Sequence, residues 1–214
     1  MPPPDPYTSW SSITERSLIA APTLLASGWI ILLPTLGKGP TRAWTLAHYL
    51  LLSGYATFAP AIVGLHHRVH RQAPALANVG AVCVFLSLPT LIGQLLLDVV
   101  SARQATTQQD MDAFFGRIQA NPLLAVLFYR GGPPFFFIGL MCLVGALVRA
   151  RAVGGPLAVM LALGIVCIVT GQLRRRYGRV LIGHLLLCGL AFVGPDPRSQ
   201  QHGAVDQRLP DALR

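Results

Sequence analysis

Charged residues are scarce in this chain, and acidic residues are the scarcest of them. Only 12% of its 214 residues are charged, and eight of these are aspartate or glutamate. Hydrophobic residues make up 53%, and the mean hydropathy is +0.55. An ordinary soluble domain needs a larger charged surface, so the composition indicates a polytopic membrane protein.

Sequence motifs of several enzyme classes are also missing. The chain has no aspartate-rich metal–diphosphate motif, no G-x-x-x-x-G-K-[ST], no H-E-x-x-H and no G-x-S-x-G. Phosphate hydrolysis, metalloproteolysis and serine acyl transfer therefore lack recognisable machinery. The four cysteines lie in apolar stretches without a C-x-x-C pair, so thiol relays and zinc ribbons have no support. We expect neither a metal nor an organic cofactor.

The net charge of +9 comes mainly from arginines at the ends of apolar stretches. No basic stripe interleaved with aromatic residues follows them, so the charge predicts contacts with membrane lipid headgroups and no nucleic-acid binding.

Six apolar stretches occupy most of the chain. They cover roughly residues 17–36, 44–65, 76–100, 122–149, 154–172 and 178–194, each about as long as a membrane-spanning helix. We therefore expect an all-α, polytopic helical membrane protein with six transmembrane helices in residues 15–195. Residues 1–14 and 196–214 are rich in proline or polar residues and are expected to be disordered tails.

Two sequence features predict departures from six straight transmembrane helices. Between the third and fourth stretches, Met111, Phe114, Phe115 and Ile118 follow the spacing of an apolar helical stripe, which predicts an interfacial helix, either a lid or a simple connection. In the fourth stretch, the run Gly131-Gly132-Pro133-Pro134 predicts a kinked or broken helix, because proline cannot donate a backbone hydrogen bond.

The polar side chains inside these stretches gather in one half of the membrane if successive helices alternate in direction. Ionisable groups at membrane depth usually face a bundle interior or a wet cavity, so we expect one pocket that opens on that face. Arginines at 174–176 and 179 lie on the same face and favour a cytoplasmic pocket mouth. The polar set is His48, Gln94, Asp98, Tyr129, Arg130, Gln172 and His184.

Asp98 is the most informative of these residues, and two interpretations of it stay open. Apolar surroundings favour the neutral carboxylic acid, which could protonate a carbon–carbon double bond while Gln94, one turn earlier, orients it. Alternatively, Asp98 pairs with Arg130 at matching depth, as a gate or assembly contact in a non-enzymatic membrane subunit or transporter.

The histidines raise a third class of function. His48 shares a helical face with Tyr55, and His184 lies at comparable depth, so the two could ligate haem in a haem- or quinone-binding redox protein. Hydrogen bonding between helices is the simpler interpretation. His66, His67 and His70 lie at the opposite membrane face; because no acid or cysteine is near them in sequence, we expect a hydrated cluster there.

Aromatic residues crowd the half of the membrane that holds the polar set. Aromatic faces stabilise cations, which would suit a carbocation intermediate, although packing explains them equally well. The candidates for contact with a substrate are Trp29, Tyr55, Phe128, Phe135 and Phe136, with Gln172 at the mouth.

A small membrane bundle with an isolated acid, many aromatics and no diphosphate-binding motif resembles the integral-membrane terpene cyclases. The similarity covers roughly residues 15–195 and is closest to the short, drimentine-type bacterial members that act on prenylated indole or diketopiperazine alkaloids; the fungal meroterpenoid cyclases are more distant. The resemblance implies a bacterial cell-membrane enzyme that protonates the alkene or epoxide of a prenyl chain already attached to a hydrophobic small molecule. The pocket then folds the chain, and loss of a proton ends the reaction.

The resemblance assigns the acid to Asp98, support to Gln94, Tyr129 and Arg130, and the terminal base to His48 or His184. The chain departs from the fungal pattern of two essential acids, because Asp98 is the one carboxylate clearly inside an apolar stretch. A second acid would have to be Asp110 or Asp112, folded over the pocket mouth.

Overall fold

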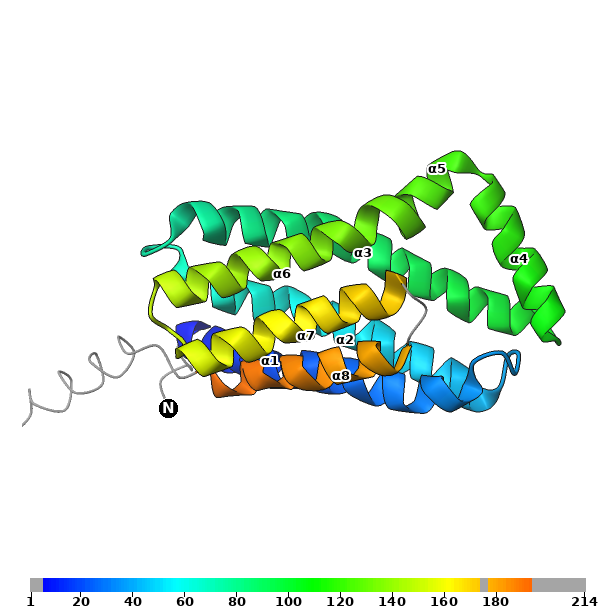
Figure 1. The fold of residues 1–214 in the computed structure, drawn as a ribbon, viewed down its shortest axis with the longest axis horizontal. Helices are drawn as coiled ribbons and strands as arrows, with labels where there is room; N and C mark the ends of the chain where they lie inside the picture. The colour runs from blue at the N-terminus through cyan, green and yellow to red at the C-terminus, as the bar shows by residue number, and fades with distance from the viewer. Residues whose placement is uncertain (1–5, 174–176, 194–214) are drawn as a thin grey trace, which may run out of the picture.

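The structure is a computed structural model that describes residues 6–173 and 177–193, and these residues form helices joined by short turns (Figure 1). Two short segments are 3-10 helices, η1 (Leu33–Thr35) and η3 (Cys188–Phe192), and η2 (Ala125–Gly131) is a π-helix. In chain order the elements are α1 (Pro6–Leu32), η1 (Leu33–Thr35), α2 (Arg42–Val69), α3 (Pro74–Gln104), α4 (Gln108–Ala120), α5 (Pro122–Leu124), η2 (Ala125–Gly131), α6 (Gly132–Arg149), α7 (Gly155–Leu173), α8 (Tyr177–Leu187) and η3 (Cys188–Phe192).

The prediction of an all-α membrane protein is confirmed at the level of helix length and composition. Five segments are long and apolar enough to span a membrane, whereas the last apolar helix, Tyr177–Ala191, is shorter. Of the six predicted crossings, five are therefore supported by length. The five are Ser12–Thr35, Arg42–Val69, Pro74–Gln104, Pro122–Arg149 and Gly155–Gln172.

The predicted tails coincide only partly with the described residues. Helix α1 begins at Pro6, so helical structure extends into the segment 1–14 that was expected to be disordered. Residues 1–5, the arginines at 174–176 and the predicted tail 196–214 lie outside the described residues.

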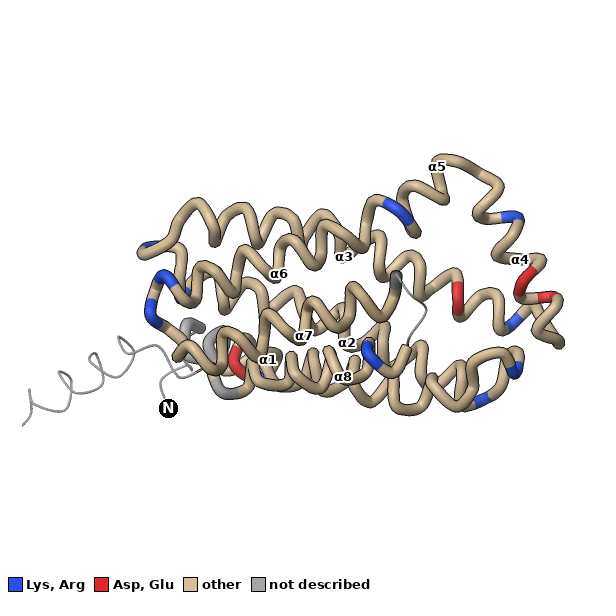
Figure 2. The backbone as a smooth tube through the Cα atoms, in the orientation of Figure 1, with Lys and Arg blue, Asp and Glu red and all other residues tan. Residues whose placement is uncertain are grey.

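Most helices pack on their neighbours in sequence, and two pairings join helices that lie further apart in the chain. Helix α1 packs on α2, α2 on α3 and α7 on α8, while α6 lies along α3 and α1 also contacts α8 (Figure 1). The lysines, arginines, aspartates and glutamates of the described residues gather towards the two ends of this bundle (Figure 2). The middle of the bundle is apolar, as a membrane interior requires.

Glycines permit the closest approaches between helices. A Cβ added to Gly139 in α6 would lie 2.7 Å from the carbonyl oxygen of Gly80 in α3. Gly164 in α7 and Gly183 in α8 face each other in the same way. Small residues at such crossings let helix backbones meet, which is how membrane helices gain van der Waals contact without a hydrophobic driving force.

The sequence predicted a kinked or broken helix at the Gly-Gly-Pro-Pro run. The structure keeps the fourth segment helical there and widens it into the π-helical η2. Pro133 and Pro134 have no backbone N–H, so the carbonyl groups of Tyr129 and Arg130 lose their α-helical partners. The N–H of Gly132 reaches back to the carbonyl of Leu127, one residue further than in an α-helix. A π-helical turn of this kind keeps the helix continuous and often accompanies a functional site.

Helix α4 lies between the third and fourth segments that are long enough to span a membrane, where the sequence predicted a helix. Its first turn is fixed by a capping box, in which the Thr107 side chain accepts from the Asp110 N–H and Asp110 accepts from the Thr107 N–H. Met111 is buried in the main core, and Phe115 packs against that core. The Gly39 N–H also donates to Gln108 Oε1 at 2.9 Å, which joins the start of α4 to the loop before α2.

Candidate active site

The structure brings Asp98 of α3 against His48 of α2. Their Oδ2 and Nε2 atoms are 3.5 Å apart, and the two side chains are only 16% and 6% exposed. The other ring nitrogen of His48, Nδ1, lies 2.8 Å from the carbonyl oxygen of Trp44. A carbonyl can only accept, so Nδ1 carries a hydrogen, and a neutral His48 presents the lone pair of Nε2 to Asp98. The pair can therefore hold one shared proton.

Trp44 covers the ring of His48. The two rings are stacked with centroids 3.6 Å apart and an angle of 27° between their planes. This contact covers one face of the imidazole and holds the ring in position beside Asp98.

The structure does not contain the pair between Asp98 and Arg130 that was one of the two interpretations of Asp98. Within the described chain, the cation within ion-pair distance of Asp98 is His48, and the Arg130 side chain is exposed. Matching depth along two helices was a necessary condition for the Arg130 pair, but direction around the helix axis decided against it. The widened turn of η2 contributes to that direction, because it changes the rotation of the residues before Gly132.

Tyr129 is the second notable polar group at this end of the bundle. Its hydroxyl is buried and has no hydrogen-bond partner among the described residues, and it lies close enough to Asp98 to interact with it electrostatically. The segment η2 and the start of α6 rest on α3: Phe128 of η2 packs over Gly93, and Gly132 of α6 lies against Thr90. A buried hydroxyl without a partner is costly, so Tyr129 is poised to bind an additional group.

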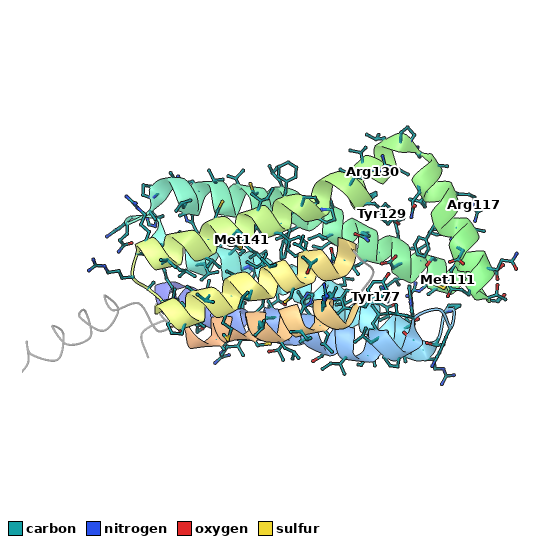
Figure 3. All side chains as sticks on the ribbon, viewed as in Figure 1. Met111, Arg117, Tyr129, Arg130, Met141 and Tyr177 are labelled. Atoms are coloured by element: carbon teal, nitrogen blue, oxygen red, sulfur yellow. The ribbon has the colours of Figure 1, made fainter. Side chains whose placement is uncertain are left out.

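An apolar groove lies next to Tyr129, along the outer face of α6 and α7. Its volume is about 720 Å³, within the usual range for small-molecule sites. Ile138, Met141 and Val166 in its walls are 41–51% exposed, so the groove opens sideways, out of the bundle. In Figure 3, Tyr129 lies towards the same end of the molecule as Met111 and Tyr177, with Met141 nearer the middle. The lining residues are Tyr129, Pro133, Pro134, Phe137, Ile138, Met141, Cys142, Ile165, Val166, Val169, Thr170 and Gln172.

His184 belongs to a separate aromatic contact. It is buried, its Nδ1 lies 2.8 Å from the Val180 carbonyl oxygen, and its ring is 6.0 Å from that of Trp29. Trp29 in turn stacks on Tyr177 at 6.0 Å. The arrangement weighs against paired haem ligation, because Trp44 and Asp98 already engage both ring nitrogens of His48.

The predicted substrate-contacting aromatics have different surroundings. Phe136 is buried and meets Tyr55 and Phe58, each with ring centroids 5.4 Å away, so Phe136 and Tyr55 lie in the core. Phe135 points outwards and is 48% exposed. Phe137, which the sequence did not single out from its triplet, is the one that lines the groove. Gln94 is half-buried on α3, one turn before Asp98.

The two aspartates of α4 already serve the helix itself. Asp110 accepts hydrogen bonds from the Thr106 and Thr107 backbone and from the Thr106 side chain, and with the Thr107 side chain these bonds lower its pKa to about 2. Asp112 accepts from Gln108 Nε2 at 2.8 Å. Both are exposed, so in this conformation neither is placed as a second acid.

Trp44 is the functional candidate that sequence reasoning missed. It was not among the aromatic candidates named from the sequence, although its position four residues before His48 places the two on one helical face. The His48–Asp98 contact had a weaker signal, since both residues lie at similar distances from the turn between α2 and α3.

Comparison with protein-family models, with curated proteins and with solved structures found no match to this chain.

Proposed function

We propose that this chain is a membrane-embedded terpene cyclase that protonates the prenyl chain of a prenylated small molecule and cyclises it without ionising a diphosphate. The observation that carries the proposal is the contact between the half-buried Asp98 and the buried His48, with Tyr129 shared between that pair and an apolar groove. An acid and a shaped apolar cavity suffice for this chemistry, so it requires neither a metal nor an organic cofactor.

The reaction would be an isomerisation. The O–H bond of Asp98 breaks as its proton joins the less substituted carbon of the terminal prenyl alkene, and the alkene electron pair forms the new C–H bond. The resulting tertiary cation is attacked by the next double bond of the chain, which closes a ring and moves the positive charge. Loss of a proton from a carbon beside the final cation restores a double bond. The product has the atoms of the substrate.

His48 would keep Asp98 supplied with its proton. With Nδ1 held by Trp44, Nε2 faces Asp98 and can return a proton to the carboxylate after each turnover. The final deprotonation falls to the Asp98 carboxylate or to His48, since His184 lies in the separate contact with Trp29. The unpaired hydroxyl of Tyr129 would hydrogen-bond to the polar part of the substrate or to Asp98 itself.

The substrate would enter from the bilayer. The groove is apolar and opens through the outer face of α6 and α7, where lipid would lie in a membrane. A prenyl chain in this groove would reach Asp98 past Tyr129. In this proposal the protein lies in a bacterial cell membrane with the pocket mouth on the cytoplasmic side, α8 provides the sixth crossing, and α4 lies at the interface.

The test uses membranes that contain the chain, incubated with farnesylated and geranylated indoles and phenols. Chromatography with mass spectrometry would detect a product of unchanged mass and shifted retention. We expect such an isomer with the parent chain, none with Asp98→Asn, and normal formation with Asp112→Asn, which changes an exposed carboxylate. No isomer from any substrate of the panel, or full activity in Asp98→Asn, would contradict the proposal.

The same pair supports a second candidate, a non-enzymatic membrane subunit or transporter in which Asp98 and His48 form a gating or assembly contact. In that case Asp98→Asn destabilises the folded protein, and the parent forms no isomer. The haem alternative is tested by the visible spectrum of the protein purified after haem supplementation, in which a Soret band would support it.

A further inference from the structure

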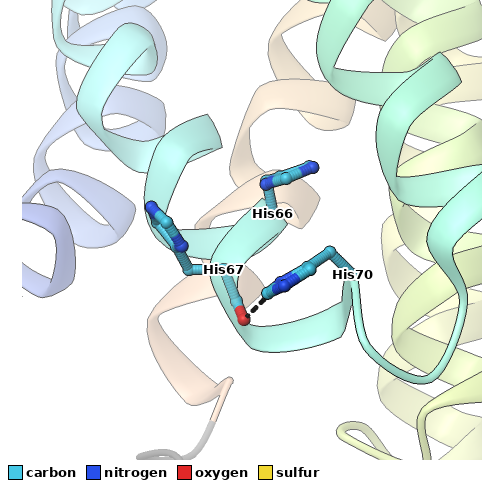
Figure 4. A group of neighbouring side chains, drawn as sticks. All are labelled: His66, His67 and His70. Carbon is cyan, nitrogen blue, oxygen red and sulfur yellow. Dashed lines mark hydrogen bonds between the residues drawn. The ribbon is translucent and has the colours of Figure 1, made fainter.

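Three histidines gather at the C-terminal end of α2, at the other end of the bundle from Asp98. His66, His67 and His70 each place one ring nitrogen within 4.8 Å of a ring nitrogen of the other two (Figure 4). His48 and His66 are eighteen residues apart on one helix, which corresponds to about 27 Å along its axis. This cluster is therefore independent of the proposed cyclase site.

We infer that His66, His67 and His70 form a binding site for a divalent transition-metal ion of the zinc type. Three imidazoles without a thiolate suit Zn²⁺, Cu²⁺ or Ni²⁺, and three protein ligands leave a position for water or a further ligand. Sequence alone had favoured a hydrated cluster, because no acid or cysteine is near in sequence. The structure changes this conclusion, because it places the three rings together.

Two of the rings already have the hydrogen bonds that metal-binding histidines make. His66 Nε2 lies 2.8 Å from Asn78 Oδ1 in α3, and His70 Nδ1 lies 3.1 Å from the His67 carbonyl oxygen. With each oxygen accepting, these nitrogens carry the hydrogens, which leaves His66 Nδ1 and His70 Nε2 as lone-pair donors. A ligating histidine almost always donates its second N–H to an oxygen in this way, which fixes the ring and its tautomer.

Closing around an ion requires the three side chains to rotate until their ring nitrogens converge. Bonds of about 2.0–2.1 Å to zinc place two ligand nitrogens about 3.3 Å apart in a tetrahedral site. His66 and His70 are one turn apart, and their rings are stacked at 5.3 Å with an angle of 10°. His67 is exposed and the other two are half-buried, so their side-chain torsions can change without disturbing the core.

The electrostatic surroundings also tolerate a cation. The last carbonyl groups of α2 give its C-terminal end a partial negative charge, and His70 is the C-cap residue. Two arginines adjoin the cluster in the sequence, Arg68 and the exposed Arg71. Arg68 is engaged elsewhere: its Nη1 donates to the Val193 carbonyl and its Nη2 to Glu15 at 3.3 Å. The charge of Arg68 is thereby partly balanced by the Glu15 carboxylate.

The experiment is a titration of the full-length protein in detergent with Zn²⁺, after treatment with a chelator and purification without a polyhistidine tag. Isothermal titration calorimetry gives the affinity, and elemental analysis gives the stoichiometry. We expect one ion per chain, with affinity at least about 10-fold weaker in His66→Ala and in His70→Ala. Gln72→Ala, in the following turn, is the matched control and should bind as the parent does.

Thermal unfolding without metal would show that the variants are folded before they are titrated. A parent protein that binds no Zn²⁺, or a His66→Ala/His70→Ala double variant that binds as tightly as the parent, would overturn the inference. Neither result bears on Asp98, so the metal site and the proposed cyclase activity are tested separately.

Discussion

Replacing Asp98 by Asn and His48 by Gln, singly and together, separates a catalytic role of the pair from a purely structural one. Two full charges 3.5 Å apart would attract each other by about 5 kcal/mol at an effective dielectric constant of 20, before any desolvation cost. Hydrogen bonds between neutral side chains in membrane bundles couple by only about 0.6 kcal/mol on average, and by at most about 1.7. The coupling free energy between Asp98 and His48, obtained from the parent, the two single variants and the double variant, therefore shows whether the pair is ionic.

A working acid must spend part of its time as the neutral carboxylic acid. We therefore expect a coupling free energy below about 2 kcal/mol, the upper part of the range for neutral pairs. The assay is equilibrium unfolding in mixed micelles with increasing SDS, carried out on the parent, both single variants and the double variant. Arg130→Gln serves as the comparison and should be additive with Asp98→Asn within about 0.5 kcal/mol.

The same variants are then assayed for isomer formation. General acid catalysis contributes about 10²–10⁴-fold, so Asp98→Asn should lower turnover by at least about 100-fold while the protein still folds. A coupling of several kcal/mol together with full turnover in Asp98→Asn would refute the catalytic assignment and identify a structural ion pair. Strong coupling of Asp98 to Arg130 would instead refute the geometry of the site.

Three further predictions follow from single features. Tyr129→Phe removes a hydroxyl without a partner, so stability in SDS unfolding should not fall, whereas isomer formation should slow by about 10-fold if the hydroxyl binds substrate. Gly139→Leu places a side chain against the Gly80 carbonyl and should lower the free energy of unfolding by at least about 2 kcal/mol, measured by the same SDS titration. The pKa of Asp110 is lowered from 3.8 to about 2 in the folded chain, so its contribution is present above pH 3.8 and is lost as pH falls towards 2. Hydrogen exchange of α4 should therefore accelerate over that window, and Thr107→Ala should remove part of the pH dependence.

Several features of the fold were predictable because they depend on local patterns. A run of apolar residues long enough to cross a bilayer favours a membrane helix wherever it packs, so five of the six predicted segments match, to within a few residues, the described helices that are long enough to span. The apolar stripe of α4 was predictable for the same reason, since its spacing is a property of the helix itself. The sequence also singled out Asp98, because a carboxylate in an apolar run is costly, and the structure places it against His48.

What the tertiary structure decided was which of these side chains meet. The sequence gives the depth of a residue in its helix but not the direction in which its side chain points relative to other helices. Depth alone therefore allowed a pair between Asp98 and Arg130, whereas the structure places Asp98 against His48. The π-helical turn arose from two prolines that remove backbone donors, and its rotation could not be read from hydropathy. The groove, with Phe137 in its wall and Phe136 in the core, likewise depends on how α6 packs against α3 and α7. Composition and periodicity determined that this chain forms apolar helices and that three histidines share one end of α2, whereas contacts between distant segments, which close only in three dimensions, decided what surrounds its acid and its hydroxyl.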